Sequence, residues 1–443
     1  MRIESAAATD VGRVRDHNED AYLVDQELGL FVVCDGMGGH ASGEVASALT
    51  IRVLQNYLRE RVAELTRVDR GEAGAELLGQ LLTEAISSAS SEVNTMGTTD
   101  RSKRGMGTTC SALLIRGAKG AMGHVGDSRL YVTRNGLHQL SDDHTFSQEA
   151  ARNGLDLSLA TKYQNVLTRA VGTQRAVKVD TLGFDVLPGD TYLLCSDGLH
   201  KYAPDAKDLS PFLENAVTAE IPQKLVAFAN EAGGSDNVTA LVVRASRTTV
   251  RTARAVQVEA DLYALRHIEL FAELNMAELV RVYGAFRERR CAPGEEVIHE
   301  DEESSTLFVI VSGTMEVQKG HTTLAVLSAG AHFGEMALLN MRRRTATVRA
   351  MDECHVLTLD REAFVTLIRE DAVLGVRLLW RLAATLSVRL DDVLIVHGSD
   401  SDTIRPPASD EAVPVIPAAA PTGFDGHTTQ VFGTVPSPYR RGN

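Results

Sequence analysis

Phe31-Val-Val-Cys-Asp-Gly36 is an apolar run that ends in a carboxylate and a glycine. Such a run predicts a buried strand, and Asp35 stands where that strand leaves the core. An unpaired carboxylate there is costly, so it needs a positive partner. Similar segments place Asp127 in Gly126-Asp-Ser-Arg129, Asp197 in Leu193-Leu-Cys-Ser-Asp-Gly198 and Asp236 in Gly233-Gly-Ser-Asp-Asn237. Because hard divalent cations prefer oxygen ligands, the sequence predicts two or more metal ions at the edge of a β core.

Turn formation is the other explanation for these aspartates, since Asp-Gly and Asp-Asn pairs form turns readily. It accounts for one or two of them but not for four together with an arginine. Gly12-Arg-Val-Arg-Asp-His-Asn-Glu-Asp20 places Arg15 beside further carboxylates. A guanidinium there forms an ion pair or binds two phosphate oxygens at once. Carboxylates with an arginine suit a pair of metal ions that activate water against a phosphoryl group.

The composition narrows the class of protein. A chain of 443 residues with 44% hydrophobic content predicts two or three packed domains. Its net charge of −14 argues against a nucleic-acid-binding protein. The five cysteines form no C-x-x-C pair, which fits a reducing compartment. With no apolar signal core and no membrane-length apolar run, we expect a cytoplasmic protein without a membrane partner.

The apolar patterns predict two folded units. Residues 1–246 alternate strands with long helices over 43–57 and 76–93, which predicts an α+β sandwich of sheets covered by helices. The strands are expected at 31–34, 109–115, 120–125, 130–133, 191–195 and 237–243. Residues 247–257 are interpreted as a linker that carries several arginines.

Residues 258–397 predict a small barrel or jelly roll, because short strands such as 306–313 and 314–317 end in glycine turns. A helix over 361–397 closes this unit, with a leucine at every fourth position from Leu374 to Leu394. Such a stripe is typical of a core-facing helix edge, and a homodimer seam is the alternative. The Pro-rich segment 398–443 is predicted to be disordered.

The motifs of residues 5–245 resemble, in order, those of the metal-dependent (type 2C) serine/threonine protein phosphatases. They are Arg15-Asp-His-Asn-Glu-Asp20, Asp35-Gly-Met-Gly-Gly-His40, Gly105-Met-Gly-Thr-Thr109, Gly126-Asp-Ser-Arg129, Val166-Leu-Thr-Arg-Ala-Val-Gly172, Ser196-Asp-Gly198 and Ser235-Asp-Asn-Val238. The resemblance implies a four-layer α-β-β-α sandwich with two Mn²⁺ or Mg²⁺ ions in a cleft at one end.

The resemblance also implies a role for each matching residue. Arg15 would hold the substrate phosphate. The metal ligands would be Asp35 between the two ions, the Gly36 carbonyl, Asp197 and Asp236, with Asp20 acting through water and Asp127 on a third ion, as in bacterial-type members. Met37 stands where many eukaryotic members carry a histidine, so the general acid is either His40 or a water. Residues 144–170 would be the mobile flap, with Gln148, Arg152 and Lys162 at the substrate's flanks.

Gly330-Ala-His-Phe-Gly-Glu-Met-Ala-Leu-Leu-Asn-Met-Arg-Arg-Arg-Thr-Ala-Thr-Val348 is the second informative block. A glycine turn before a short helix can point backbone N–H groups at an anion. The block resembles the phosphate-binding cassette of cyclic-nucleotide-binding domains. The resemblance implies that Glu335 binds the ribose 2′-hydroxyl and Arg344 the cyclic phosphate. The remaining contacts would come from Gly334, Met336, Ala337 and Thr345. Cyclic AMP and cyclic GMP both stay open. Asp301-Glu302 replaces the family's usual Gly-Asp upstream turn, which puts the shape of that turn in question.

Together these features predict a phosphatase that hydrolyses phosphoserine or phosphothreonine in phosphoproteins made by serine/threonine kinases, regulated by a cyclic nucleotide. The alternative is a catalytically silent pseudophosphatase that serves as a nucleotide-binding scaffold.

Overall fold

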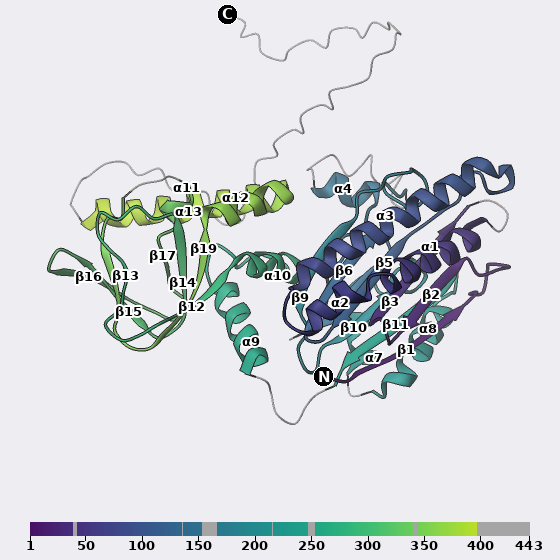
Figure 1. Cartoon of the computed structure of the whole chain (residues 1–443), viewed down its shortest axis with the longest axis horizontal. Coiled ribbons are helices and arrows are strands. Elements are labelled where there is room, and N and C mark those ends of the chain that lie inside the picture. Colours follow the sequence, from purple (N-terminus) through teal and green to yellow (C-terminus); the bar gives the residue numbers. More distant parts are fainter. Residues whose placement is uncertain are drawn as a thin grey trace, which may run out of the picture.

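The computed structural model describes residues 1–38, 42–134, 136–152, 166–214, 216–246, 253–339 and 343–396, with side chains to residue 388. Figure 1 shows a mixed helix-and-sheet unit that contains the N-terminus, joined to a smaller sheet-rich unit. Within these described ranges, every helix is too short or too polar to traverse a lipid bilayer.

Strand β3 (Leu30–Met37) shows why the decisive apolar run has no polar alternation. Leu30, Val32 and Cys34 lie in a core beneath helices, whereas Phe31 and Val33 lie in a second core between two sheets. Because both faces of this sheet are covered, the strand reads as continuously hydrophobic. Asp35 continues the face of Phe31 and Val33, so its side chain emerges at the end of the layer between the sheets.

The N-terminal unit is a sandwich of two antiparallel sheets. One has the order β2-β3-β5-β6-β9, with β4 beside β3; its further strands are β2 Asp20–Asp25, β4 Gly107–Thr108, β5 Cys110–Arg116, β6 Lys119–Val125 and β9 Asp180–Asp185. The other has the order β1-β11-β10-β7-β8; its strands are β1 Ile3–Asp10, β7 Arg129–Thr133, β8 Leu137–Gln139, β10 Thr191–Cys195 and β11 Val238–Ala245.

Helices cover both outer faces, which confirms the predicted four-layer α-β-β-α arrangement (Figure 1). Helices α1 (Ser42–Arg59) and α3 (Ala75–Thr99) cover the first sheet, and α8 (Ile221–Glu231) covers the second. The shorter helices are α2 Val62–Asp69, α4 Phe146–Arg152, α6 Asp197–His200 and α7 Ser210–Leu213, with 3-10 turns at Arg101–Lys103, Ala206–Asp208 and Thr218–Glu220.

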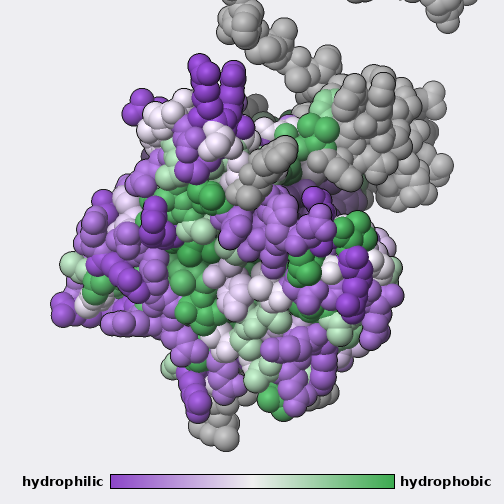
Figure 2. All heavy atoms as spheres, turned by 90° about the vertical axis from the view of Figure 1, so that its right-hand side faces the viewer, coloured by the Kyte–Doolittle hydropathy of each residue, from purple (hydrophilic) through white to green (hydrophobic). Residues whose placement is uncertain are grey.

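Figure 2 turns the right-hand end of this unit in Figure 1 toward the viewer. Hydrophilic residues cover most of that face, and hydrophobic residues form a band between them.

The C-terminal unit confirms the predicted jelly roll with flanking helices. Its two antiparallel sheets have the orders β12-β19-β14-β17 and β13-β18-β15-β16. The strands are β12 Arg287–Cys291, β13 Glu296–Ile298, β14 Thr306–Ser312, β15 Thr314–Lys319, β16 Thr322–Ser328, β17 His332–Phe333, β18 Thr347–Ala350 and β19 Cys354–Asp360. The helices are α9 Ala253–Arg266, α10 Met276–Ala285, α11 Met336–Leu339, α12 Arg361–Glu370 and α13 Ala372–Val396.

Helix α10 lies between the two units in Figure 1 and belongs to the cores of both. Ala277 and Val280 are buried in the core between the two sheets of the N-terminal unit. Leu279 and Val282 are buried in the core of the C-terminal unit, which also receives Leu187 from the segment after β9. An Asn275–Glu278 capping box fixes the start of α10.

The predicted closing helix over 361–397 is wrong in one respect, because it is two helices divided at Asp371. Asp371 adopts an extended backbone conformation with φ −134° and ψ 94°, and its carboxylate accepts a hydrogen bond from the Leu374 N–H. Leu374, Leu378 and Leu382 lie in the core of the C-terminal unit, as expected of a core-facing edge. The side chains of Leu390 and Leu394 and the predicted disordered tail lie outside the described residues.

The elements that sequence patterns missed in the N-terminal unit include strands β1, β2, β8 and β9 and helices α2 and α8. Strand β1 has the sequence Ile-Glu-Ser-Ala-Ala-Ala-Thr-Asp, which is poor in β-branched and aromatic residues. It is a strand because all eight of its residues pair with β11, from Ile3 opposite Ala245 to Asp10 opposite Val238.

Candidate active site and nucleotide pocket

The ends of the sandwich strands bring the four aspartates to one pocket of about 600 Å³. Asp35 lies near the end of β3, Asp127 follows β6, Asp197 begins α6 after β10, and Asp236 precedes β11. All four line this pocket together with Arg15, Gly36 and Glu19. The structure thus places side chains that are two hundred residues apart around one space.

Backbone and hydroxyl contacts fix Asp35 and Asp20. The Asp35 N–H donates to Thr109 Oγ1 at 2.9 Å, and its carbonyl accepts from the Thr109 N–H and the Thr108 hydroxyl, both at 2.8 Å. Asp20 lies opposite Asp35 in the β2–β3 register. Its Oδ2 accepts from Ser196 Oγ at 2.8 Å and Thr239 Oγ1 at 2.6 Å, but its buried Oδ1 has no hydrogen-bond partner among the described residues.

Burial and mutual repulsion raise the pKa values of these carboxyl groups above their ordinary range. Burial raises the pKa of Asp20 to about 7, and the negative charges of Asp197 and Asp236 add to the shift. The pKa of Asp127 is likewise raised to about 7 by burial and by Asp197. Burial also raises the pKa of Asp35 and Asp197. Such a cluster gains stability from any bound cation.

Two cationic side chains face the cluster in the structure. Arg15 Nε and Nη2 lie 2.8 and 3.0 Å from the two oxygens of Asp236, and Lys201 Nζ lies 3.5 Å from Asp236 Oδ2. In the described part of the chain, no three carboxyl, imidazole or thiol groups converge closely enough to form a finished metal cage. The carboxylates predicted to enclose the metal ions therefore line one pocket. Bound cations would have to bring their oxygen atoms closer together.

Two residues that support the site were missed by the sequence analysis. Asn237 Nδ2 donates to the carbonyls of Val11 and His17, at 3.0 and 2.9 Å, and its Oδ1 accepts from the Glu19 N–H at 2.8 Å. His200 Nε2 lies 2.9 Å from the Asp127 carbonyl. Asn237 therefore fixes the arginine-bearing loop beside Asp236. Its place in the Ser-Asp-Asn motif is the signal that could have identified it.

The predicted flap is described in two pieces, 144–152 and 166–170. Val166, Leu167, Thr168, Arg169 and Ala170 line the pocket. Arg152 lies in ion pairs with Asp142 at 3.1 Å and Asp371 at 3.5 Å, and its contact with a substrate stays a prediction. His40 and Lys162 lie outside the described residues.

A second pocket of about 450 Å³ lies in the C-terminal unit, lined by all six residues predicted to bind the nucleotide: Gly334, Glu335, Met336, Ala337, Arg344 and Thr345. Glu335 and Arg344 are buried, whereas Met336 and Thr345 are exposed. Arg344 Nη2 donates to Ser304 Oγ and to the Thr306 carbonyl, both at 2.7 Å. Its buried Nε has no hydrogen-bond partner among the described residues, so it can still bind an anion.

The turns around this pocket require special backbone conformations. Gly334 has φ +81°, and a Cβ there would lie 2.7 Å from Arg344 Nη1 and 2.8 Å from the Thr306 carbonyl. Asp301 has φ +65°, a left-handed conformation that aspartate tolerates better than most residues. The substitution of the usual glycine therefore keeps a left-handed turn.

Residues 12–230 match the family model of protein phosphatase 2C, and residues 288–371 match that of the cyclic nucleotide-binding domain. The serine/threonine phosphatase stp of Listeria innocua is 34% identical over 242 residues, which cover 53% of this chain and 93% of that relative. The chain belongs to the protein phosphatase 2C family. This confirms the predicted family and enzyme class, together with the C-terminal cyclic nucleotide-binding domain.

Other members resemble the same part of the chain. The serine/threonine protein phosphatase PstP of Mycobacterium tuberculosis is 35% identical over 241 residues, 54% of this chain and 44% of that protein. A crystal structure of a PstP catalytic domain in complex with two manganese ions is 33% identical, with a TM-score of 0.46, and covers 55% of this chain and 98% of that one.

Replacement of Gly198 by alanine tests how closely two aspartate-bearing segments must approach. A Cβ on Gly198 would lie 1.9 Å from the Asn237 carbonyl oxygen, so Asp197 and Asp236 would be pushed apart. We expect Gly198→Ala to weaken Mn²⁺ binding by about 10-fold or more and to lower the free energy of unfolding by about 1–3 kcal/mol. Calorimetric titration and thermal unfolding measure both effects.

Gly284→Ala is the control, because a Cβ there meets nothing within 4 Å. Unchanged Mn²⁺ affinity in Gly198→Ala would contradict the geometry.

The raised carboxyl pKa values predict that cation binding releases protons. Asp20 and Asp127, each with a pKa of about 7, are partly protonated near neutral pH, and the cation must displace those protons. We expect Mn²⁺ affinity to rise from about pH 6 to about pH 8, with fewer protons released as the pH rises. Calorimetry in buffers of different ionisation enthalpy counts the protons, and Asp127→Asn should release fewer.

The same groups predict the pH dependence of the metal-free fold. Their folded pKa values exceed those of the unfolded chain, so they stabilise the fold below about pH 4, and this contribution is lost as the pH rises through about 7. Stabilisation by Mn²⁺ should therefore be larger at about pH 8 than at about pH 6. Equal shifts in melting temperature at both pH values would contradict the assignment.

Proposed function

We propose that this chain hydrolyses phosphoserine and phosphothreonine in proteins, under the control of a cyclic nucleotide bound in its C-terminal domain. The observation that carries the proposal is the pocket that gathers Arg15, Asp35, Asp127, Asp197 and Asp236 at one end of the sandwich. Few other chemistries require several repelling carboxylates beside a guanidinium.

The buried, unpartnered Asp20 Oδ1 and the raised carboxyl pKa values fit Mn²⁺ or Mg²⁺. Asp35 and the Gly36 carbonyl, with Asp197 and Asp236, would hold two ions, Asp20 would act through water, and Asp127 would serve a third ion. When bound, these ions supply positive charge that lowers the pKa of a water and stabilises developing charge on phosphate oxygens. Glu19 lines the same pocket.

Arg15 would orient the substrate phosphate through two parallel hydrogen bonds. Its exposed position and its ion pair with Asp236 support this role, because Asp236 would be turned to a cation and would leave both guanidinium edges to the phosphate. His40 or a water would protonate the departing alkoxide.

In the C-terminal domain, Glu335 would accept from the ribose 2′-hydroxyl and Arg344 would bind the cyclic phosphate, supported by the Gly334 turn and the start of α11 with Met336 and Ala337. Exposed Thr345 fits contact with either cyclic AMP or cyclic GMP.

A homodimer through the last helix stays a prediction, as do a cytoplasmic location and the boundaries 1–246, 247–257, 258–397 and 398–443. Helix α9 begins at Ala253, inside the predicted linker.

The pseudophosphatase alternative is not favoured. A silent scaffold has no need to keep repelling carboxylates together, whereas Asp35, Asp127, Asp197 and Asp236 all line the pocket beside Arg15. No observation on the described residues points to loss of the catalytic set.

Substitution of the site residues tests the phosphatase activity. We expect Asp35→Asn to lower Mn²⁺-dependent kcat on a phosphothreonine peptide by about 10²-fold or more, since it removes a central charge from the cation site. Arg15→Ala should raise KM and lower kcat/KM by at least about 10-fold, because the phosphate loses a bidentate donor. Asp205→Asn, a helix-cap change outside the pocket, should behave like the parent chain. The absence of Mn²⁺-dependent turnover in the parent chain would sink the proposal.

The nucleotide pocket is tested by calorimetric titration with cyclic AMP and cyclic GMP. Arg344→Ala should weaken binding of the preferred nucleotide by about 10-fold or more, because a buried charge-assisted bond to the phosphate is lost. Glu335→Ala should weaken it less, since it removes one hydroxyl contact. Arg287→Ala, on the exposed face of β12, should bind normally. Equal affinity in Arg344→Ala and the parent chain would rule out this assignment.

A further inference from the structure

Charged side chains join the two domains where α4 of the phosphatase meets the break between α12 and α13. Asp371 Oδ2 accepts from Arg281 Nη1 at 2.8 Å and lies 3.5 Å from Arg152 Nη2. Arg152 Nη1 also donates to Asp142 Oδ2 at 3.1 Å. Arg152 and Asp142 belong to the phosphatase, whereas Asp371 and Arg281 belong to the nucleotide-binding unit. The Arg152–Asp371 contact therefore crosses between domains.

On the phosphatase side, α4 is hydrogen-bonded to the wall of the metal pocket. The Phe146 N–H donates to the Val166 carbonyl at 2.9 Å, and the Thr168 N–H donates to the His144 carbonyl at 2.9 Å. Thr168 Oγ1 donates to Glu149 Oε1 at 2.7 Å. Val166 and Thr168 line the pocket that holds the aspartates. A shift of α4 must therefore move this wall or break these bonds.

The start of α4 is also connected to a predicted metal ligand. The His144 N–H donates to the Gly126 carbonyl at 2.8 Å, and the Gly126 N–H donates to His144 Nδ1 at 3.0 Å. Gly126 directly precedes Asp127. The position of α4 thus bears on both the wall and one carboxylate of the pocket.

On the nucleotide side, two short packed helices separate the pocket from Asp371. Helix α11 follows Glu335 directly, and its Leu338 lies in the same core as Phe364 and Leu367 of α12. Asp371 is the first residue after α12. A rearrangement of α11 around a bound nucleotide would therefore be transmitted through α12 to Asp371.

We propose that Asp371 is a positioning residue for the phosphatase cleft, which holds α4 through Arg152 and passes the state of the nucleotide pocket to the metal site. This inference rests on the proposed function. The contact is suited to opening and closing because each partner keeps a second ion pair, Arg152 with Asp142 and Asp371 with Arg281. Opening it leaves each of the two side chains with one ion pair, so no buried charge is left unpaired.

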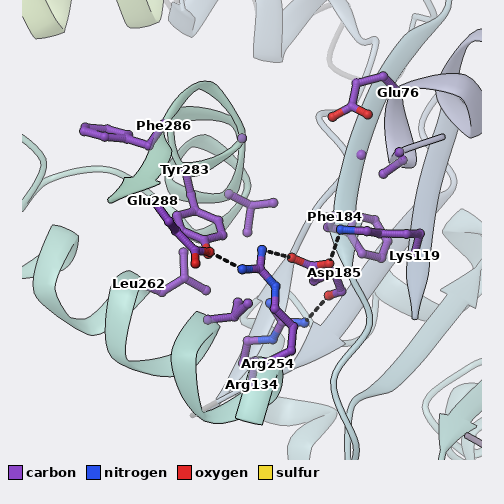
Figure 3. A pocket seen from close by; sticks show the side chains of 16 residues that line it. Glu76, Lys119, Arg134, Phe184, Asp185, Arg254, Leu262, Tyr283, Phe286 and Glu288 are labelled. Atoms are coloured by element: carbon purple, nitrogen blue, oxygen red, sulfur yellow. Dashed lines mark hydrogen bonds and ion pairs between the residues drawn. The ribbon is translucent and has the colours of Figure 1, made fainter. Parts of the chain in front are cut away.

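A second ion pair holds the domains together elsewhere and supplies a matched control. Figure 3 shows Arg254 of α9 reaching across the interdomain pocket to Asp185, at 2.9 Å, and also pairing with Glu288 of its own domain. Lys119 also binds Asp185. None of these residues lines the metal pocket or contacts α4 in the described structure. Loss of Arg254 should loosen the interface without touching the proposed route.

The test compares kcat/KM of the full chain on a phosphothreonine peptide with Mn²⁺, with and without saturating cyclic AMP or cyclic GMP. We expect the preferred nucleotide to change kcat/KM of the parent chain by about fivefold or more. Asp371→Asn keeps the hydrogen bond to the Leu374 N–H but removes the charge, and it should abolish most of this change. Arg152→Gln should do the same, and the double variant should add nothing further.

Arg254→Gln should keep the nucleotide response. The inference is overturned if Asp371→Asn still responds like the parent chain while binding nucleotide. It is also overturned if Arg254→Gln loses the response to the same extent, because the effect would then be general loosening of the interface.

Hydrogen exchange provides a readout that does not depend on turnover. Bound nucleotide should change amide exchange in Phe146–Arg152 and at residues 166–170 of the parent chain, but not in Asp371→Asn. If the parent chain shows this change but no hydrolysis, the proposed function fails and the inference stands. If nucleotide binds without changing exchange in these segments, the inference fails whatever the activity.

Discussion

Repulsion among carboxylates at one end of the sandwich is the constraint on which the site depends. Asp20, Asp35, Asp127 and Asp197 all have raised pKa values, because each is removed from water and placed near the others. A chain free to relax would separate them. The strands prevent this, since their side chains fill one core between the sheets and one beneath each helical layer. Stability gained in those cores offsets the cost of holding the aspartates together.

Helix α10 is packed into the cores of both domains. Its Ala277 and Val280 complete the core between the phosphatase sheets, and its Leu279 and Val282 enter the core of the nucleotide-binding unit. Separation of the domains would expose the apolar face of this helix that packs against the other domain, together with its partners there, at about 25 cal/mol for each Å². Arg281 and Glu278 on the same helix also pair with Asp371 and Arg377 of the C-terminal helices. The nucleotide-binding domain is therefore packed against the phosphatase through a helix that both cores share.

Local sequence patterns predicted the elements whose structure depends mainly on their own residues. The run from Phe31 to Cys34 marks β3 because covered sheets need apolar residues on both faces. The aspartates could be identified as candidate metal ligands because each one follows or precedes such an apolar run. Patterns failed where a distant partner decides the outcome. Strand β1 exists through its pairing with β11, and Asn237 acts on the loop that carries Arg15.

The contacts of Arg152 were also beyond what local sequence patterns can predict. Its place in the flap suggested a substrate contact, but nothing near it in the sequence reveals that Asp371, 219 residues away, would lie within reach. The break between α12 and α13 was hidden for a related reason. Helical periodicity runs through it, and only the extended backbone at Asp371, with its carboxylate on the Leu374 N–H, ends one helix and begins the next.

The Arg254–Asp185 and Arg152–Asp371 ion pairs between the domains differ in length and in their neighbours. Arg254 bonds Asp185 at 2.9 Å, and each keeps a second partner, Glu288 for Arg254 and Lys119 for Asp185. Arg152 meets Asp371 at 3.5 Å, and both have closer partners within their own domains. Opening either contact therefore leaves both of its side chains paired, and the longer Arg152–Asp371 contact loses less attraction when it opens. A switch also has to lead to the site, and of these two contacts only Arg152–Asp371 reaches α4, whose hydrogen bonds hold the wall of the metal pocket in the described structure.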